Sequence, residues 1–254
     1  MGAAPGRQQG VGAPAFAPAP PFRATSPGPF PQSAGVRRDV CSAVGDVIGN
    51  PKGDSVNYRV QPTAQVDGTA VVGDGSSVWE LAQIRENARL GENCVVGRGA
   101  YVGTGVRIGD NVKIQNYALV YEPAELADGV FIGPAVVLTN DMNPRSVDPD
   151  GKLKRGSDWE AVGVKIAEGA SLGARSVCVA PVRIGRWAMI AAGAVVTKDV
   201  PDFGLVVGVP ARRIGWAGRA GVKLVERNGE PGVWECPRTG ALHDEKDGVL
   251  TERL

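Results

Sequence analysis

The 254-residue sequence predicts an all-β fold, a solenoid in which short parallel strands coil around one hydrophobic core. Two observations carry this prediction. Glycine and proline number 36 and 19, and these residues are the poorest helix formers. In addition, an aliphatic residue recurs at every sixth position of the central region. A six-residue period fits neither a helix nor a hairpin strand, but three such hexads make one triangular coil of a parallel β-helix.

The first column of the repeat begins at Val60 and continues without exception. Its members, which should fill the interior, are Val60, Val66, Val72, Val78, Ile84, Leu90, Val96, Val102, Ile108, Ile114, Val120, Leu126, Ile132 and Leu138. A second column of small residues stands four positions later, and we expect these residues near the corners of the coil: Ala64, Ala70, Ser76, Ala82, Ala88, Cys94, Ala100, Val106, Val112, Ala118, Ala124, Val130 and Val136. Glycine often follows the aliphatic residue directly, as at Gly73, and we expect it to supply the positive φ angles of tight turns.

The period stops after Leu138 and resumes at Ile166, which predicts an inserted loop over residues 139–165. The aliphatic column then includes Cys178, and the small column before the loop includes Cys94. We therefore expect both cysteines to be small buried residues rather than reactive thiols. The solenoid domain is assigned to residues 58–216.

Three segments flank the solenoid. Residues 1–38 are rich in Pro, Gly and Ala, which predicts a disordered tail, and residues 39–57 form a lead-in segment. Residues 217–254 depart from the repeat. Two apolar runs on either side of Asn228-Gly229 predict a small hairpin-like cap in this last segment.

Charge and composition exclude several classes of function. The chain has 28 basic and 27 acidic residues, so no strong field attracts nucleic acid or an anionic membrane. No run of about 18 apolar residues could span a bilayer. The 4 cysteines are widely spaced, as is typical of a reducing cytoplasm. The only histidine is His243, which excludes a histidine base in the solenoid, and we expect no metal site.

The repeat resembles the hexapeptide-repeat acyltransferases, and the resemblance covers residues 60–216. That family implies a left-handed parallel β-helix that associates as a homotrimer. Three segments are most similar to nucleotide-sugar 3-N-acetyltransferases of the UDP-2-acetamido-3-amino-2,3-dideoxy-glucuronate type: NVKIQNYALV at 111–120, IGPAVVLTNDMNPRSV at 132–147 and GAVVTKDVPDFGLVVGVPARRIGW at 193–216. The implied activity is transfer of an acetyl group from acetyl-CoA to the 3-amino group of a nucleotide-linked sugar, in the cytoplasm.

The resemblance also implies the catalytic residues. In these enzymes the Asn of a Thr-Asn pair lies beside the sugar amine, and this residue corresponds to Asn140. Asp141 matches the next residue in relatives that act on dTDP-linked sugars. Asn143 and Arg145 lie in an Asn-Pro-Arg motif of the same family and are expected to contact substrate. Asn140 and Asp141 would equally suit a simple turn at the start of a loop, and that alternative stays open.

Three further substrate candidates come from the solenoid wall. Glu80 and Gln83 follow Trp79 and stand where the family has a Trp-His-x-x-His-like stretch near the substrate. Asn116 is the third candidate, and its alternative role is an asparagine ladder within the wall. Glu80 could equally be a solvated surface charge.

An amine acceptor explains why the solenoid needs no histidine. A free amine attacks a thioester unaided, whereas a hydroxyl requires a positioned base. Asn140 would then accept a hydrogen bond from the amine and fix its direction. Asp141 or Glu80 would receive the proton.

The resemblance places acetyl-CoA in a groove between neighbouring solenoids, near the later coils. Small residues there leave room for its approach, namely Gly173, Ala191, Ala192 and Gly193. Lys198, Arg212 and Arg213 would neutralise its phosphates, unless they are solvated charges that cap the solenoid. Two other functions remain as alternatives: a non-catalytic scaffold, and acyl transfer to a non-nucleotide amine in secondary metabolism.

Overall fold

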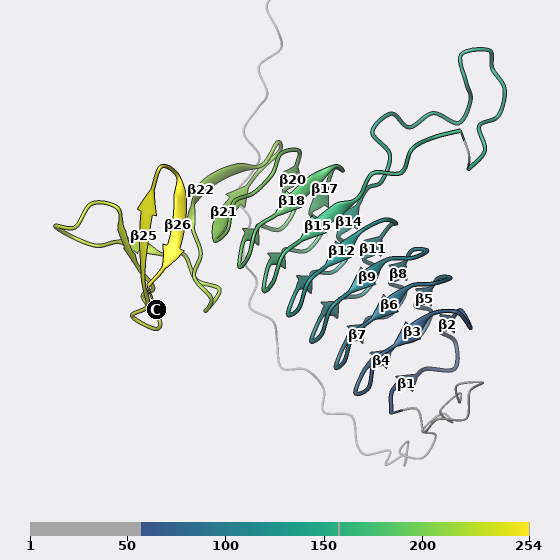
Figure 1. Ribbon diagram of the computed structural model, residues 1–254, viewed down its shortest axis with the longest axis horizontal. Coiled ribbons are helices and arrows are strands. Elements are labelled where there is room, and N and C mark those ends of the chain that lie inside the picture. Colours follow the sequence, from purple (N-terminus) through teal and green to yellow (C-terminus); the bar gives the residue numbers. More distant parts are fainter. Residues whose placement is uncertain (1–56, 157, 254) are drawn as a thin grey trace, which may run out of the picture. The chain divides into compact units, whose positions relative to one another are not determined.

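The computed structural model describes residues 57–156 and 158–253 (Figure 1). The tail expected at 1–38, nearly all of the lead-in segment and Cys41 lie outside the described residues. Strands and turns make up the described part of the chain, and within it no helix occurs that could cross a membrane. The all-β prediction is confirmed.

The solenoid has three parallel sheets, which we call faces A, B and C (Figure 1). Face A consists of β1 (Arg59–Val60), β4 (Ser77–Val78), β7 (Val95–Val96), β10 (Lys113–Ile114), β13 (Phe131–Ile132), β16 (Ser171–Leu172), β19 (Met189–Ile190), β21 (Gly204–Val207) and the antiparallel β22 (Arg212–Trp216). Face B consists of β2 (Gln65–Val66), β5 (Gln83–Ile84), β8 (Tyr101–Val102), β11 (Leu119–Val120), β14 (Val137–Leu138), β17 (Val177–Cys178) and β20 (Val195–Val196). Face C consists of β3 (Val71–Val72), β6 (Arg89–Leu90), β9 (Arg107–Ile108), β12 (Glu125–Leu126), β15 (Val164–Ile166) and β18 (Val182–Ile184).

The two columns found in the sequence form the core. Each strand pairs in register with the strand one coil later, as Gln83 does with Tyr101, so that residues 18 apart stack. From Val78 onward both columns are buried, whereas Val66 and Val72 in the first coil are only partly covered. Cys94 and Cys178 are buried as expected, and burial raises the pKa of the Cys178 thiol to about 12.

The glycines after the aliphatic residues have a different role from the one expected. A Cβ atom at Gly133 would lie 2.6 Å from the carbonyl oxygen of Leu172 in the next coil. These glycines therefore allow two coils to approach. The positive φ angles fall two positions later, at Asn93 (55°), Asn111 (58°) and Gly75 (73°). The expectation was wrong because the turn needs its left-handed residue at its end rather than at its start.

The inserted loop leaves the solenoid after β14 and projects from it (Figure 1). It ends at residue 163, because β15 begins at Val164, slightly earlier than the repeat indicated. At its base the Val162 amide donates to the Asn140 carbonyl over 3.0 Å. An antiparallel bridge between Val147 and Leu153 closes its tip.

The last segment forms a four-stranded antiparallel sheet rather than a single hairpin. Its strands are β23 (Val225–Glu226), β24 (Val233–Glu235), β25 (Leu242–Lys246) and β26 (Val249–Glu252). The expected hairpin at Asn228-Gly229 joins β23 to β24. The pairings of β24 with β25 and of β25 with β26 were missed because β25 reads LHDEK, which has little apolar alternation. A second core lies under this sheet, built from Phe203, Trp216, Leu224, Cys236 and Leu250.

His243 on β25 is fully buried, and neither ring nitrogen has a hydrogen-bond partner among the described residues. Its ring packs edge-on against Phe203, with 5.2 Å between ring centroids. Burial lowers the pKa of His243, although the charge of Glu252 opposes this shift. The folded state therefore favours the neutral imidazole.

This burial predicts acid sensitivity of the last sheet. Because the pKa of His243 is lower in the folded state, its share of the free energy of unfolding is complete above the ordinary value of about 6.5 and is lost as pH falls below it. Urea unfolding followed by tryptophan fluorescence should show lower stability at pH 5 than at pH 8. The His243→Leu variant should have a flatter profile, and equal pH dependence in both proteins would contradict the assignment.

Candidate active site

The candidate site lies at the turns that lead from face B to face C, which we call the B–C corner. In successive coils the same corner position is held by Glu86, Thr104, Glu122 and Asn140. The next residue after Asn140 continues into the inserted loop instead of closing the turn. Asn140 therefore sits where the regular wall ends and the loop begins.

Two hydrogen bonds hold the chain in place on either side of Asn140. The hydroxyl oxygen of Thr139 accepts the Ala180 amide at 3.0 Å, and the Asn140 carbonyl accepts the Val162 amide. The side-chain amide of Asn140 is half-buried and makes no hydrogen bond within the described structure. Its oxygen and nitrogen are thus available to a ligand.

Asp141 is partly used by the loop itself. Its Oδ1 atom accepts the backbone amide of Asn143 at 2.8 Å, the geometry of an Asx turn. This contact agrees with the alternative in which Asp141 starts a turn, and it leaves the second carboxylate oxygen without a contact in the described structure. Arg145 is exposed further along the loop, where its guanidinium donates to the Pro144 carbonyl at 3.0 Å.

Glu122, which the sequence reasoning did not single out, lies one coil before Asn140. Its Oε2 atom is buried and has no hydrogen-bond partner among the described residues. The carboxylate lies across Gly103, where a Cβ atom would collide with Oε2. The returning end of the loop packs on the same turn, because a Cβ atom at Gly163 would lie 2.6 Å from the Pro123 carbonyl oxygen. The 18-residue stacking register would have pointed to Glu122 once Asn140 was chosen.

Two tyrosines line the wall beside Glu122. The rings of Tyr101 and Tyr121 have centroids 5.2 Å apart and are tilted by 49°. Burial raises the pKa of Tyr101, and the negative charge of Glu122 raises it further, whereas Arg85 opposes the shift. The Oε2 atom of Glu122 therefore lacks a hydrogen-bond partner close to aromatic rings, where an unpartnered buried polar atom costs free energy.

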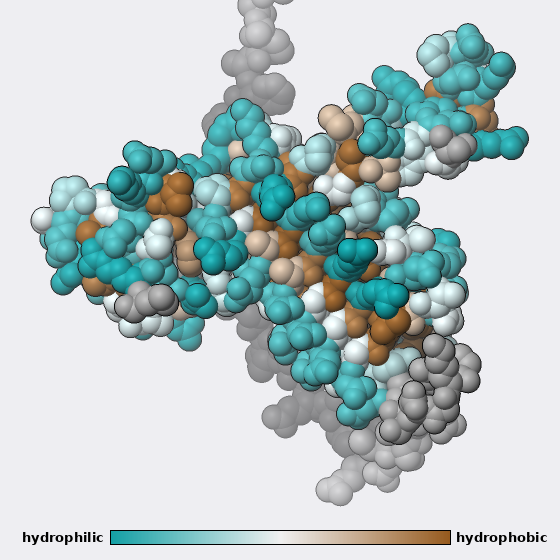
Figure 2. Space-filling view, viewed as in Figure 1, coloured by the Kyte–Doolittle hydropathy of each residue, from teal (hydrophilic) through white to brown (hydrophobic). Residues whose placement is uncertain are grey.

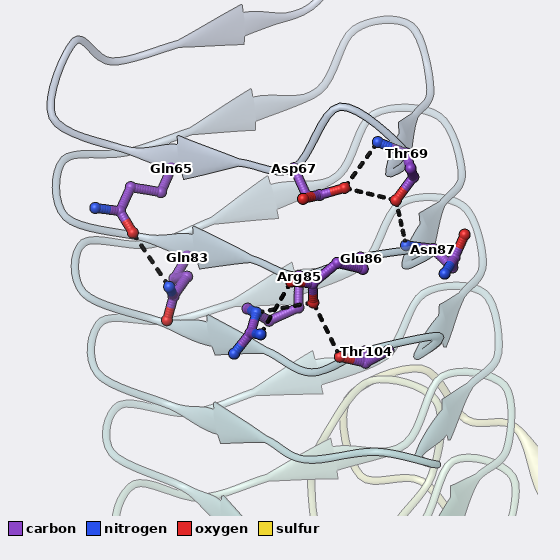
Figure 3. Close-up of polar contacts among 8 residues, drawn as sticks. All are labelled: Gln65, Asp67, Thr69, Gln83, Arg85, Glu86, Asn87 and Thr104. Atoms are coloured by element: carbon purple, nitrogen blue, oxygen red, sulfur yellow. Dashed lines mark hydrogen bonds and ion pairs between the residues drawn. The ribbon is translucent and has the colours of Figure 1, made fainter.

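The other carboxylate of this corner column is fully paired. Glu86 accepts two hydrogen bonds from Arg85, at 2.9 and 3.0 Å, and one from the Thr104 hydroxyl at 3.1 Å (Figure 3). These hydrogen bonds, with that of Arg85 the largest cause, lower the pKa of Glu86 to about 2. Glu86 and Glu122 thus occupy equivalent positions, but protein donors satisfy Glu86 and leave the buried Oε2 atom of Glu122 without a partner.

The remaining substrate candidates lie elsewhere on the solenoid. Glu80 and Asn116 occupy the turns from face A to face B, which we call the A–B corner. The Oδ1 atom of Asn116 accepts the Arg98 amide at 3.0 Å, which matches the ladder alternative. Gln83 points outward from face B and bonds to Gln65. Within one chain, face B separates the A–B corner from Asn140.

The expected cofactor residues are also divided. Four of them lie at the A–B corner of the last coils: Gly173, Ala191, Ala192 and Gly193. Glycine is required at position 173, because a Cβ atom there would collide with the backbone of Ala192. Lys198 is exposed in the turn after β20. Arg212 bonds to the Ala211 carbonyl at 2.9 Å. Arg213 stacks over Trp216 at 3.9 Å and pairs with Glu245 at 3.6 Å, so it contacts the last sheet.

Faces B and C differ in charge. The outward residues of face B carry no charge, whereas those of face C include Arg89, Arg107, Glu125, Lys165 and Arg183. Figure 2 shows hydrophilic side chains beside apolar patches on one side of the solenoid. Among the described residues no three His, Cys, Asp or Glu side chains are arranged to hold a metal ion.

The repeats match two family models. Residues 105–140 match a model described as bacterial transferase hexapeptide (six repeats). Residues 87–117 and 163–198 match a model described as hexapeptide repeat of succinyl-transferase.

The proteins similar to the chain include two curated relatives and one solved structure. The dTDP-3-amino-3,6-dideoxy-alpha-D-galactopyranose 3-N-acetyltransferase of Aneurinibacillus thermoaerophilus is 38% identical over 89 residues, 35% of this chain and 44% of the relative. Serine acetyltransferase of Escherichia coli K12 is 38% identical over 90 residues, 35% of this chain and 32% of the relative. The chain thus spans less than half the length of either relative. A UDP-N-acetylglucosamine acyltransferase from Bacteroides fragilis shares the fold at 17% identity and a TM-score of 0.51, over 63% of this chain and 61% of that one.

Proposed function

We propose that this chain is a hexapeptide-repeat acyltransferase and that it transfers an acetyl group from acetyl-CoA to the 3-amino group of a nucleotide-linked amino sugar. The observation that carries the proposal is the pair of unpartnered polar groups at the B–C corner, the Asn140 amide and the Glu122 carboxylate, one coil apart. The relative from A. thermoaerophilus is named for this reaction on a dTDP-linked sugar, which supports the same acceptor class here.

The reaction suits a site without histidine. The amine nitrogen forms a bond to the thioester carbonyl carbon, the carbon–sulfur bond breaks, and CoA leaves as its thiol after the nitrogen loses a proton. The protein must hold the amine and the thioester together and receive that proton. The only histidine, His243, is buried in the second core and takes no part.

Each group at the corner has a role in this scheme. The Asn140 side-chain oxygen accepts an N–H of the amine and aims its lone pair at the thioester. The Glu122 carboxylate attracts the amine and accepts the released proton, since no protein group neutralises its Oε2 atom. Asp141 is a second acceptor, with one oxygen still available outside its turn.

The donor and the assembly complete the proposal. Acetyl-CoA approaches the A–B corner at Gly173 and Ala191–Gly193, with Arg212 beside its phosphates. Lys198 lies at the B–C corner and would reach these phosphates from a neighbouring chain. The reaction takes place in the cytoplasm. Because face B separates this corner from Asn140, the donor and acceptor sites lie at different corners of one chain. A second copy brings them together if the A–B corner of one chain meets the B–C corner of its neighbour. We therefore include a homotrimer in the proposal.

Face B offers a surface for that contact. Its outward residues in the later coils are uncharged and half-buried: Leu119, Val137, Val177 and Val195. Sedimentation at micromolar concentration should show a species of three chains. Val177→Asp should dissociate it and abolish turnover, because it places charges within an apolar contact. A wild-type monomer with full activity would contradict the proposed assembly.

Asn140→Ala tests the acceptor site. Thiol release from acetyl-CoA should be measured with UDP- and dTDP-linked 3-amino sugars. The variant should lose tens- to thousands-fold in kcat/KM, about 2–4 kcal/mol of transition-state stabilisation, and remain folded because the residue lies outside the buried columns. No thiol release by the wild-type protein with any such sugar would overturn the proposed function, and near-wild-type kinetics of Asn140→Ala would leave it a turn residue.

Glu122→Gln tests the proton acceptor. If the carboxylate receives the proton, the variant should lose about 100-fold in kcat at pH 7 and recover as pH rises, since more amine arrives deprotonated. Asp141→Asn should show this recovery only if Asp141 is the acceptor instead. Glu125→Gln is the matched control, because Glu125 lies on the same coil but pairs with Lys165 at 3.2 Å on the surface. Equal kinetics of Glu122→Gln and Glu125→Gln would rule out the Glu122 role.

A further inference from the structure

Three polar side chains occupy the first part of the outward column of face B, before its apolar part begins. Gln65, Gln83 and Tyr101 stand on β2, β5 and β8, in direct register from one coil to the next. The four outward residues that follow in this column are aliphatic. The polar group is therefore confined to one end of an otherwise apolar strip.

The two glutamines are joined by a single hydrogen bond. Gln83 donates from Nε2 to the Oε1 atom of Gln65 over 3.1 Å. Figure 3 shows the Gln65 nitrogen and the Gln83 oxygen pointing away from this bond. The pair thus leaves one whole NH2 group and one carbonyl oxygen free on neighbouring amides. Exchanging the assigned nitrogen and oxygen of both amides leaves the same set of free groups.

This pattern matches the edge of a nucleobase. Every base presents a hydrogen-bond donor beside an acceptor on its polar edge, and glutamine and asparagine amides are the side chains that read such edges in pairs. Both amides stand at the rim of a hollow of about 1030 Å³ at the first-coil end of the solenoid, which is lined largely by inward residues such as Val60, Val66 and Ile84. A planar polar ring stacked on face B would therefore find a donor and an acceptor side by side at this end of the solenoid.

The distance to Asn140 suits a nucleotide-linked sugar. Face B runs in register from Gln83 through Tyr101 and Leu119 to Val137, which is followed by Asn140. Three coils at about 4.8 Å each separate the amide pair from the loop base, roughly 14 Å. A ribose and a diphosphate would fill this interval. Tyr101 lies within this interval. Burial raises the pKa of its hydroxyl group, and the nearby Glu122 raises it further.

We propose that Gln65 and Gln83, with Tyr101 beside them, form the nucleobase subsite of the acceptor. The assignment rests on the proposed function, since it presumes a nucleotide-linked substrate that lies along the B–C edge of face B with its amine at Asn140. The assignment gives Gln83 a role in binding the nucleobase rather than the sugar. It also explains why a paired amide ladder occurs in the first coils of face B and not in the later ones.

Direct binding, without turnover, tests the subsite. Titration calorimetry should measure UDP and dTDP with the full chain, and competition should measure inorganic pyrophosphate as a probe without a base. Gln83→Leu and Gln65→Leu should each raise the Kd of UDP or dTDP about tenfold or more, the loss expected for one or two hydrogen bonds. The Kd of pyrophosphate and that of CoA should not change.

Gln115→Leu is the matched control, because Gln115 lies in the turn after β10 and outside the face B column. It should bind every probe as the wild type does. Wild-type affinity of the Gln83→Leu variant for UDP and dTDP would overturn the subsite. So would an equal loss of pyrophosphate binding, or a change in sedimentation, which would show that the glutamines contact another copy.

The outcomes separate this subsite from the reaction. If the protein binds UDP or dTDP through Gln83 but releases no thiol with any amino sugar, the subsite is supported and the acetyltransferase assignment is contradicted. If the wild type and Gln83→Leu acetylate an amino sugar with the same kcat/KM, the acetyltransferase assignment is supported and the subsite is contradicted.

Discussion

The structure depends on one constraint, the fixed register of each coil on the next. Two-residue strands contribute too few hydrogen bonds to hold a sheet by themselves, so every strand is stabilised by its neighbours above and below. The register places aliphatic side chains on aliphatic side chains inside and small residues on small residues at the corners. It also requires glycine wherever one backbone crosses closely over another, as at Gly133.

The same register builds the candidate site. Glu86, Glu122 and Asn140 are far apart in sequence yet form one column at the B–C corner. Their environments differ because their neighbours in the adjacent columns differ. Arg85 and Thr104 satisfy Glu86, whereas Glu122 faces Tyr101 and Gly103 and receives no donor. A repeated backbone can thus carry one paired carboxylate and one unpaired carboxylate at equivalent positions.

Much of the fold could be predicted from the sequence, because burial in a repeat is a one-dimensional pattern. The buried columns and the loop after Leu138 follow from spacing alone. The antiparallel sheet was only half predicted, since the polar β25 gains its stability from Trp216 and Phe203, which come from other segments. For the site, resemblance pointed to Asn140, but the missing partners of Glu122 are visible only when side chains have positions. The sequence also could not show that Glu80 and Asn140 lie at different corners of one chain.

The inserted loop costs the folded chain little free energy. Across it, Glu125 pairs with Lys165, which is 40 residues away instead of the usual 18. The extra loop-closure entropy is only about 0.7 kcal/mol, because this cost grows with the logarithm of length. The coils on both sides keep their register whatever the loop contains. Segments of other lengths and sequences could therefore replace residues 142–161 at little thermodynamic cost, so the part of the molecule closest to Asn140 is also the part that is most free to diverge.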